Sequence, residues 1–174
     1  MSFTRGYVHV YTGDGKGKTT TSLGLAMRAA GAGLRVAVIQ FMKGRRYSEI
    51  DTAELIPGFD IFQHGRDEFV SREDPEQIDI DLAREGFEHA REIIQGGEYD
   101  MVILDEINVA MDFDLLPIDE VLEMIRDRPV HVELVLTGRN APEKIMKEAD
   151  LITEMREIKH FYKQGVQARK GIEF

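Results

Sequence analysis

The segment from Tyr11 to Thr20 constrains the fold more than any other part of the chain. It stands between an apolar run at 7–11 and a helical pattern at 19–30, and its glycines, lysines and threonines are Gly13, Gly15, Gly17, Lys16, Lys18, Thr19 and Thr20. Glycines at a strand-to-helix junction let backbone N–H groups turn around phosphate oxygens, while a lysine adds a cation and a threonine hydroxyl reaches Mg²⁺. The segment therefore predicts a nucleoside triphosphate site in an α/β fold.

The whole loop and one helical arginine are the predicted nucleotide-binding residues. They are Gly13, Asp14, Gly15, Lys16, Gly17, Lys18, Thr19, Thr20 and, on the helix behind the loop, Arg28. One position departs from the usual pattern, because Thr12 stands where such loops open with glycine. We expect Gly13 and Gly15 to supply the flexibility that Thr12 lacks.

Short apolar runs alternate with amphipathic stretches along the chain, which predicts an α/β fold with helices on both faces of a mostly parallel sheet. The expected strands lie at 7–11, 35–41, 60–64, 99–104, 130–136 and 151–158. Long helices are expected at 19–30, from Pro75 to Gly96 and after Pro117, with Asn140 capping a further helix that has Pro142 in its first turn. With no internal repeat, residues 1–174 are predicted to form one domain of the P-loop NTPase (RecA-like) type.

A second half of the site is predicted at the end of the apolar run 101–104, where Asp105 and Glu106 follow directly. A carboxylate at the end of such a strand orients Mg²⁺ or its water in phosphate-loop proteins. On its own a strand ending in two acids is a weak signal, but the upstream loop strengthens it. Thr19 with Asp105 or Glu106 is therefore the predicted Mg²⁺ site, and the sequence leaves open which acid contacts the metal.

Another polar triplet, Thr137-Gly138-Arg139, follows the expected strand 130–136 and so lies at the same edge of the sheet. Arg139 is a candidate ligand for phosphate or for a substrate carboxylate, although an exposed turn arginine is the plainer alternative. The five histidines do not show the spacing of a metal-ligand set.

The composition of the chain limits which classes of partner it is expected to bind. The formal net charge is −10, so nucleic acid is not expected as a partner, although a basic cluster at 43–46 either meets a phosphate-bearing ligand or is a solvated loop. The chain has no cysteine, which excludes thiolate ligands and a cysteine nucleophile. No signal-peptide pattern and no apolar run of membrane-spanning length is present, so we expect a cytoplasmic protein without a membrane partner.

Taken together, the motifs resemble the ATP:corrinoid adenosyltransferases almost from end to end. The matching segments are 12–20, 40–44, 102–106, 112–117, 137–139 and 149–155, with Lys159-His160 and the ending at 165–174. The carboxyl end is the most specific part, because general NTPases do not share it.

The resemblance implies transfer of the 5′-deoxyadenosyl group of ATP to Co(I) of a reduced corrinoid, with triphosphate as the leaving group. In this family ATP lies in the loop in the reverse of the usual sense, so the 5′ carbon faces the corrinoid. Lys18 would then offset the charge of the leaving group, and Glu106, Asn108 and Arg139 would be candidates to face the corrinoid. A homodimer and a reductase that supplies Co(I) are also implied.

One segment departs from the family. Relatives carry an aromatic segment with Phe and Trp after the third strand, whereas this chain has no Trp and offers only Phe69 within 65–72. Either Phe69 displaces the lower ligand of cobalt, or displacement differs, or the corrinoid lacks that ligand. A surface loop with a docked phenylalanine is the plainer alternative.

Two other functions remain open on the sequence alone. A small-molecule kinase or ATPase would use the same loop and acids, and would release ADP or phosphate in place of triphosphate. A corrinoid delivery module would bind the corrinoid without forming a cobalt–carbon bond. Neither alternative accounts for the carboxyl end.

Overall fold

A parallel sheet of six strands forms the centre of the protein, whose computed structural model describes residues 3–68 and 70–174. The strands are β1 (Val8–Thr12), β2 (Val36–Gln40), β3 (Phe59–Gln63), β4 (Met101–Asp105), β5 (Glu133–Thr137) and β6 (Leu151–Glu154). They lie in the order β3-β2-β4-β5-β1-β6, and every neighbouring pair is parallel. The carboxyl ends of all six strands therefore meet at one edge of the sheet, where ligands bind in such folds.

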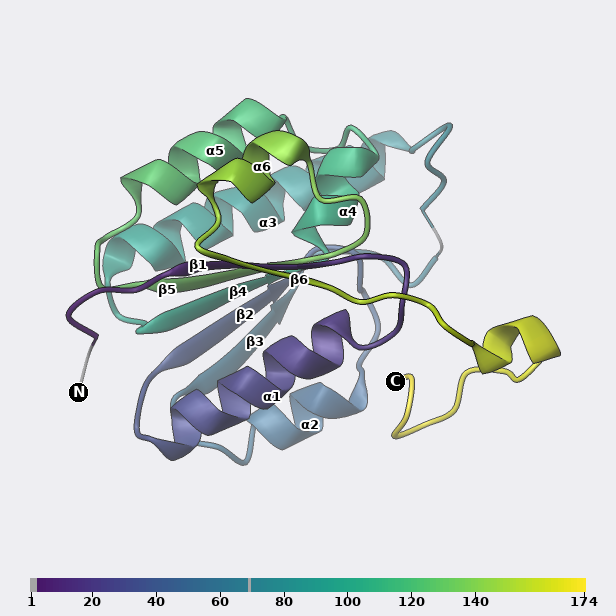
Figure 1. Cartoon of the computed structure of the whole chain (residues 1–174), viewed down its shortest axis with the longest axis horizontal. Helices are drawn as coiled ribbons and strands as arrows, with labels where there is room; N and C mark the ends of the chain where they lie inside the picture. The colour runs from purple at the N-terminus through teal and green to yellow at the C-terminus, as the bar shows by residue number, and fades with distance from the viewer. Residues whose placement is uncertain (1–2, 69) are drawn as a thin grey trace.

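Helices cover both faces of the sheet, as the sequence predicts (Figure 1). They are α1 (Lys18–Gly31), α2 (Ser48–Ala53), α3 (Gln77–Gly96), α4 (Ile107–Asp112), α5 (Ile118–Asp127), α6 (Glu143–Glu148) and the 3₁₀ helix η1 (Phe161–Gln164). Figure 1 shows α1 and α2 on one face and α3, α4, α5 and α6 on the other. Among the described residues, no helix is long and apolar enough to cross a membrane.

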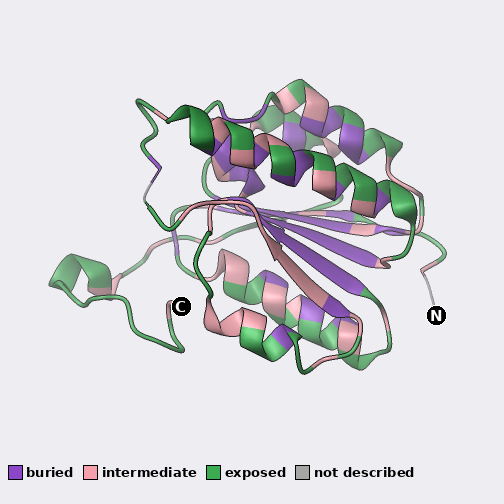
Figure 2. Ribbon diagram, turned by 180° about the vertical axis from the view of Figure 1, so that it is seen from behind, coloured by how far each residue is buried: buried purple, intermediate pink, exposed green. Residues whose placement is uncertain are grey.

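The two faces of the sheet hold two hydrophobic cores. Along β2, Ala37 and Ile39 belong to the larger core under α3, α4 and α5, while Val36 and Val38 belong to the smaller core under α1. This alternation follows from the two-residue period of a strand, and it makes the central strands apolar on both sides. Figure 2 shows the result as buried central strands between helices that are exposed on their outer sides.

Helix α3 shows how local sequence and packing agree. Its first turn has a capping box, in which Glu76 is the N-cap and the Asp79 carboxylate accepts a hydrogen bond from the Glu76 N–H at 2.9 Å. In its middle, a Cβ on Gly86 would lie 2.8 Å from the Cβ of His64. Glycine at this position therefore lets α3 lie close to the end of β3, in spite of its low helix propensity.

The predicted elements agree with the structure apart from small shifts at their ends and the differences that follow, to which the unpredicted 3₁₀ helix η1 belongs. The short helices α2 and α4 were not predicted, because six residues give too little periodicity to recognise. The predicted cap at Asn140 is wrong: Asn140 has a positive φ of 53° and donates to Asp112 at 2.9 Å, and α6 begins only after Pro142. The last strand ends at Glu154 and does not continue to residue 158.

Candidate functional site

The glycine loop joins β1 to α1 and takes its shape from two residues with positive φ, Gly13 at 95° and Gly17 at 123°. Thr12 keeps the extended conformation of β1, and its hydroxyl accepts a hydrogen bond from the Ala141 N–H at 3.2 Å. The missing first glycine is thus compensated at Gly13, which adopts the left-handed conformation that glycine favours.

The segment that follows β6 holds this loop from one side. The Gly15 N–H donates to the Met155 carbonyl at 2.6 Å, and the Met155 N–H donates to the Thr12 carbonyl at 2.8 Å. A Cβ on Gly13 or Gly15 would lie 2.5 or 2.7 Å from the Met155 oxygen. Gly15 is therefore required for close approach of two backbones, and not for a positive φ.

Lys18 lies within the loop. Its ammonium donates to the carbonyls of Gly13 and Gly15 at 2.7 and 2.8 Å. Burial lowers the pKa of Lys18, and nearby Arg139 lowers it further. An ammonium held by two neutral carbonyls can exchange them for a phosphate oxygen, which is the stronger acceptor.

Asp105 is the buried centre of the predicted metal site. Its carboxylate accepts four hydrogen bonds. Oδ1 accepts from Thr19 Oγ1 and Thr137 Oγ1, both at 2.8 Å, and Oδ2 accepts from Lys43 Nζ at 3.1 Å and Gln40 Nε2 at 3.3 Å. Asp105 is completely buried at the end of β4, so these bonds replace the water it has lost. The structure thus brings the predicted Thr19 and Asp105 together and adds three residues that the sequence did not assign to the metal site.

Lys43 is one of these additional residues, and it is not part of a solvated loop. Its side chain is 14% exposed, and its ammonium also contacts Glu49 at 3.3 Å. Burial by itself would lower the pKa of Lys43, but Asp105 and Glu49 outweigh burial and raise it. Lys43 is therefore a permanent buried cation beside Asp105.

Glu106 adopts a left-handed conformation with φ of 67°, immediately before α4. Such a conformation costs a non-glycine residue about 1–3 kcal/mol, and residues that adopt it cluster at functional sites. The Glu106 N–H donates to Thr137 Oγ1 at 2.9 Å, which fixes the turn. Burial raises the pKa of Glu106, as does Asp105, while Lys43, Lys18 and Arg139 act in the opposite direction. Glu106 therefore lies among the cations of the site.

Gly138, Arg139 and Asn108 lie beside this turn. Gly138 has φ of 134°, and a Cβ there would lie 2.9 Å from the Cβ of Asn108. Arg139 extends toward the loop and donates to the Asp14 carbonyl at 3.4 Å. Asn108 is completely buried beneath Gly138. Its role toward a corrinoid stays a prediction from the sequence.

Arg28 is the one predicted nucleotide-binding residue that the structure does not bring to the loop. It lies exposed in the last turn of α1, whose first residue is Lys18. Ten residues of α-helix span about 15 Å, which separates Arg28 from the phosphate loop. The role of Arg28 in binding the nucleotide stays a prediction from the sequence.

Lys16, Asp14 and Thr20 occupy the outer side of the loop. The side chain of Lys16 turns toward the carboxyl-terminal segment, where it meets Glu173 Oε1 at 2.6 Å. Asp14 and Thr20 are exposed. Of the predicted loop residues, Lys18 and Thr19 are thus the two whose side chains point to the interior of the site.

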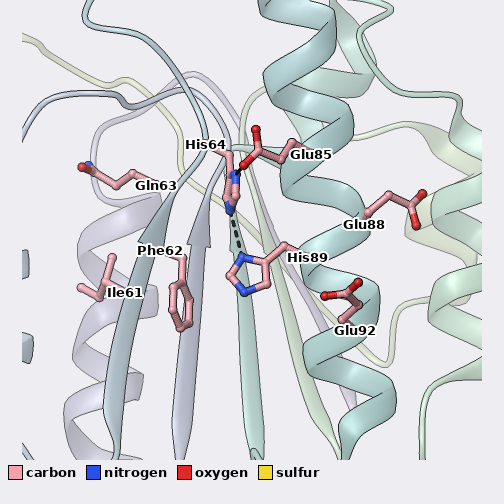
Figure 3. Close-up of a pocket in the computed structure, with 8 residues that line it drawn as sticks. All are labelled: Ile61, Phe62, Gln63, His64, Glu85, Glu88, His89 and Glu92. Atoms are coloured by element: carbon pink, nitrogen blue, oxygen red, sulfur yellow. Dashed lines mark hydrogen bonds and ion pairs between the residues drawn. The ribbon is translucent and has the colours of Figure 1, made fainter.

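A separate groove of about 650 Å³ opens between β3 and α3 (Figure 3). Within it, His64 Nε2 and His89 Nδ1 are 3.0 Å apart, and the pKa of His64 is lowered by burial and by His89. Four strand spacings, or about 19 Å, separate β3 from β1 and its loop. Over the described ranges 3–68 and 70–174, no three His, Asp or Glu side chains are grouped so as to hold a metal ion. This groove is therefore distinct from the loop site.

The fold and the loop, with Lys18 inside it and Thr19 hydrogen-bonded to Asp105, define a P-loop nucleotide-binding protein. Residues 4–174 match the sequence model of the family described as ATP:corrinoid adenosyltransferase BtuR/CobO/CobP. The chain belongs to this family, as the sequence motifs predict.

Individual relatives are similar over nearly the whole chain. The chain is 36% identical over 170 residues to a corrinoid adenosyltransferase of Escherichia coli (strain K12), a match that covers 98% of this chain and 86% of that protein. It is 37% identical over 174 residues to a corrinoid adenosyltransferase of Sinorhizobium sp, covering 98% and 81%. A third relative, corrinoid adenosyltransferase CobA of Salmonella typhimurium, is 35% identical over 170 residues, covering 98% and 86%.

Proposed function

We propose that this protein transfers the 5′-deoxyadenosyl group of ATP to Co(I) of a reduced corrinoid and releases inorganic triphosphate. The family match over residues 4–174 carries this proposal. The intact loop supports it, because Lys18 and Thr19 keep the positions that a triphosphate and its metal require.

The chemistry needs no nucleophile from the protein. Co(I) donates an electron pair to C5′, the cobalt–carbon bond forms and cobalt becomes Co(III), while the C5′–O bond breaks and its electron pair leaves with triphosphate. The protein would hold the two substrates in line and stabilise the charge on the leaving oxygen. Lys18 would perform that second task, and the position of its ammonium within the loop supports this role.

Mg²⁺ is the proposed cofactor, and the residues present fit it. Hydroxyl and carboxylate oxygens are the ligands that Mg²⁺ prefers, and Thr19, Asp105 and Glu106 offer them within one site. Since Asp105 already accepts four hydrogen bonds, we assign direct contact to Thr19 and Glu106 and an orienting role to Asp105. When bound, Mg²⁺ would neutralise phosphate charge.

On this proposal Glu106 and Arg139 lie on the side of the site that receives the corrinoid. A homodimer, a reductase that supplies Co(I) and a cytoplasmic location stay predictions from the sequence. The role of Phe69 as a substitute for the family's aromatic segment also stays a prediction, because Phe69 lies outside the described residues.

An anaerobic assay tests the proposed function. The purified protein is mixed with ATP, Mg²⁺ and chemically reduced cobalamin or cobinamide, the Co(I) absorbance is followed, and the phosphate product is identified. We expect an alkyl-cobalt spectrum with stoichiometric triphosphate. Lys18→Ala should lower the rate by about 100-fold or more, as expected for loss of a charge at the leaving group, whereas Lys147→Ala on the outer side of α6 should not.

Other outcomes would select the alternatives. ADP and phosphate with unchanged Co(I) would indicate a phosphoryl-transfer enzyme. Corrinoid binding without a cobalt–carbon bond, under conditions where ATP binds, would indicate a delivery module.

A further inference from the structure

The C-terminal tail, residues 155–174, turns back over the outer side of the phosphate loop (Figure 1). At its start Met155 supports the loop through the hydrogen bonds described above. At its end the Phe174 carbonyl accepts a hydrogen bond from Ser48 Oγ at 3.1 Å, at the beginning of α2. The guanidinium of Arg45 lies 4.9 Å from the centre of the Phe174 ring and 5.2 Å from that of Tyr47. The tail therefore joins the loop to the segment that follows β2.

Two cations share one carboxylate of the tail, one cation from the phosphate loop and one from the tail itself. Lys16 Nζ lies 2.6 Å from Glu173 Oε1, and Arg169 Nη2 lies 3.3 Å from the same oxygen. Both cations also flank the ring of Phe161, at 5.5 Å for Lys16 and 4.9 Å for Arg169. Arg169 is thus beside a lysine of the phosphate loop, although 153 positions separate Arg169 from Lys16 in the sequence.

Two adjacent cations repel each other unless an anion lies between them. Glu173 is that anion here, because hydrogen bonds from Arg169 and Lys16 lower its pKa to about 2 and keep it ionised at neutral pH. A carboxylate and a phosphate oxygen make the same kind of bond to lysine and arginine, and the phosphate carries more charge. An incoming triphosphate can therefore replace Glu173 between the two cations.

The exposure of the two cations makes this exchange possible. The side chain of Arg169 is 50% exposed and that of Lys16 is 37% exposed. Ion pairs at such exposed positions contribute little to folding, since water and salt screen them. Releasing Glu173 should therefore not disturb the fold.

Resting on the proposed function, we propose that Arg169 is a further triphosphate-binding residue, which the C-terminal tail brings to the phosphate loop beside Lys16. Glu173 occupies the place of a phosphate oxygen between these cations and is displaced when the triphosphate binds. The site thus has a loop part, with Lys18, and a tail part, with Arg169.

The test measures binding of inorganic tripolyphosphate to the full chain by calorimetry, with Mg²⁺ and without corrinoid. Arg169→Met should weaken binding about tenfold, the effect of one charge-assisted hydrogen bond. Lys170→Met is the matched control, because it removes the same charge from the neighbouring exposed residue. Arg169→Lys should recover most of the loss, and Glu173→Gln should tighten binding several-fold, because it removes the competing anion.

Three results would overturn the proposal. In the first, Arg169→Met binds tripolyphosphate as tightly as Lys170→Met does. In the second, Arg169→Lys binds as weakly as Arg169→Met, which would indicate a purely structural role. In the third, Glu173→Gln binds more weakly than the wild type. Because tripolyphosphate binding needs no corrinoid, this result is independent of the transfer assay. If the wild type transfers the adenosyl group but Arg169→Met binds tripolyphosphate normally, only this inference fails. If Arg169→Met weakens tripolyphosphate binding but the wild type shows no transfer, only the proposed function fails.

Discussion

Asp105 and Glu173 are both carboxylates that bind a lysine of the nucleotide site, yet they differ in burial and in the elements that supply their partners. Asp105 is completely buried at the end of β4 and accepts hydrogen bonds from four side chains, which belong to β2 and β5 or their ends and to helix α1. Glu173 belongs to an exposed tail, and Lys16 and Arg169 are its side-chain donors. The first carboxylate holds the strand ends in a fixed geometry, whereas the second can be exchanged for a ligand.

The difference shows how one site can be both rigid and accessible. A buried carboxylate that loses a partner leaves an uncompensated charge in the interior, so every neighbour of Asp105 is constrained. A carboxylate at the surface regains water when its partner leaves, so Glu173 imposes little constraint on the positions of Lys16 and Arg169. Four predictions test this contrast.

The largest effect should come from Asp105→Asn. It removes the anion and leaves Lys43 buried without its main partner, so the free energy of unfolding should fall by about 3 kcal/mol. Urea denaturation measures this loss. Asp81→Asn, an exposed position on α3 that accepts a bond from Gln77, serves as control. An equal loss in both variants would contradict the central role of Asp105.

Lys43→Met should lower the free energy of unfolding by about 2 kcal/mol, less than Asp105→Asn because three donors to Asp105 remain. The pKa of Lys43 is raised from 10.5, so its contribution is complete below that pH and is lost as the pH rises through the folded value. The difference in free energy of unfolding between wild type and variant should therefore become smaller when urea denaturation is measured at alkaline pH. A gap that persists unchanged above the folded pKa would contradict an electrostatic origin.

Glu173→Gln should leave the midpoint of urea denaturation unchanged, since the tail buries little and its ion pairs are exposed. The same preparation should still show the altered affinity for tripolyphosphate. If the midpoint falls as far as in Asp105→Asn, the two carboxylates do not differ as we infer.

The smallest effect concerns pH. The pKa of Glu173 is lowered to about 2, so Glu173 stays ionised through the pH range in which a glutamate ordinarily takes up a proton. Its ion pairs are lost only as the pH falls toward about 2. The ratio of tripolyphosphate affinities between wild type and Glu173→Gln should thus stay constant from about pH 5 to pH 8. A ratio that changes within this interval would show that Glu173 titrates there.

The sequence predicted the parts of the site that depend on local pattern. Glycines before Lys18 and Thr19, and acids after an apolar strand, identify a loop and a strand end without knowledge of neighbours. The alternation of apolar runs and amphipathic stretches likewise predicted the sheet, its helices and the side of the sheet that carries the site.

Residues whose role depends on spatial neighbours could not be predicted in this way. Gln40 and Lys43 reach Asp105 only because β2 lies beside β4 in the sheet. The burial of Asn108 could not be predicted either, because the short helix α4 turns this residue inward beneath Gly138. Arg169 lies in the ending that resembles the family, but no local pattern assigns it to a phosphate, since its neighbour on the loop lies at the opposite end of the chain.

The support that Met155 gives to the phosphate loop has a consequence for how the protein folds. Strand β1 pairs with β5 and β6, and the Val8 N–H donates to Asp150 across 142 residues. Contacts between such distant residues form slowly, because closing a long loop of chain costs conformational entropy before the contacts stabilise it. The loop that is easiest to recognise in the sequence should therefore be among the last parts of the molecule to reach its native shape during refolding.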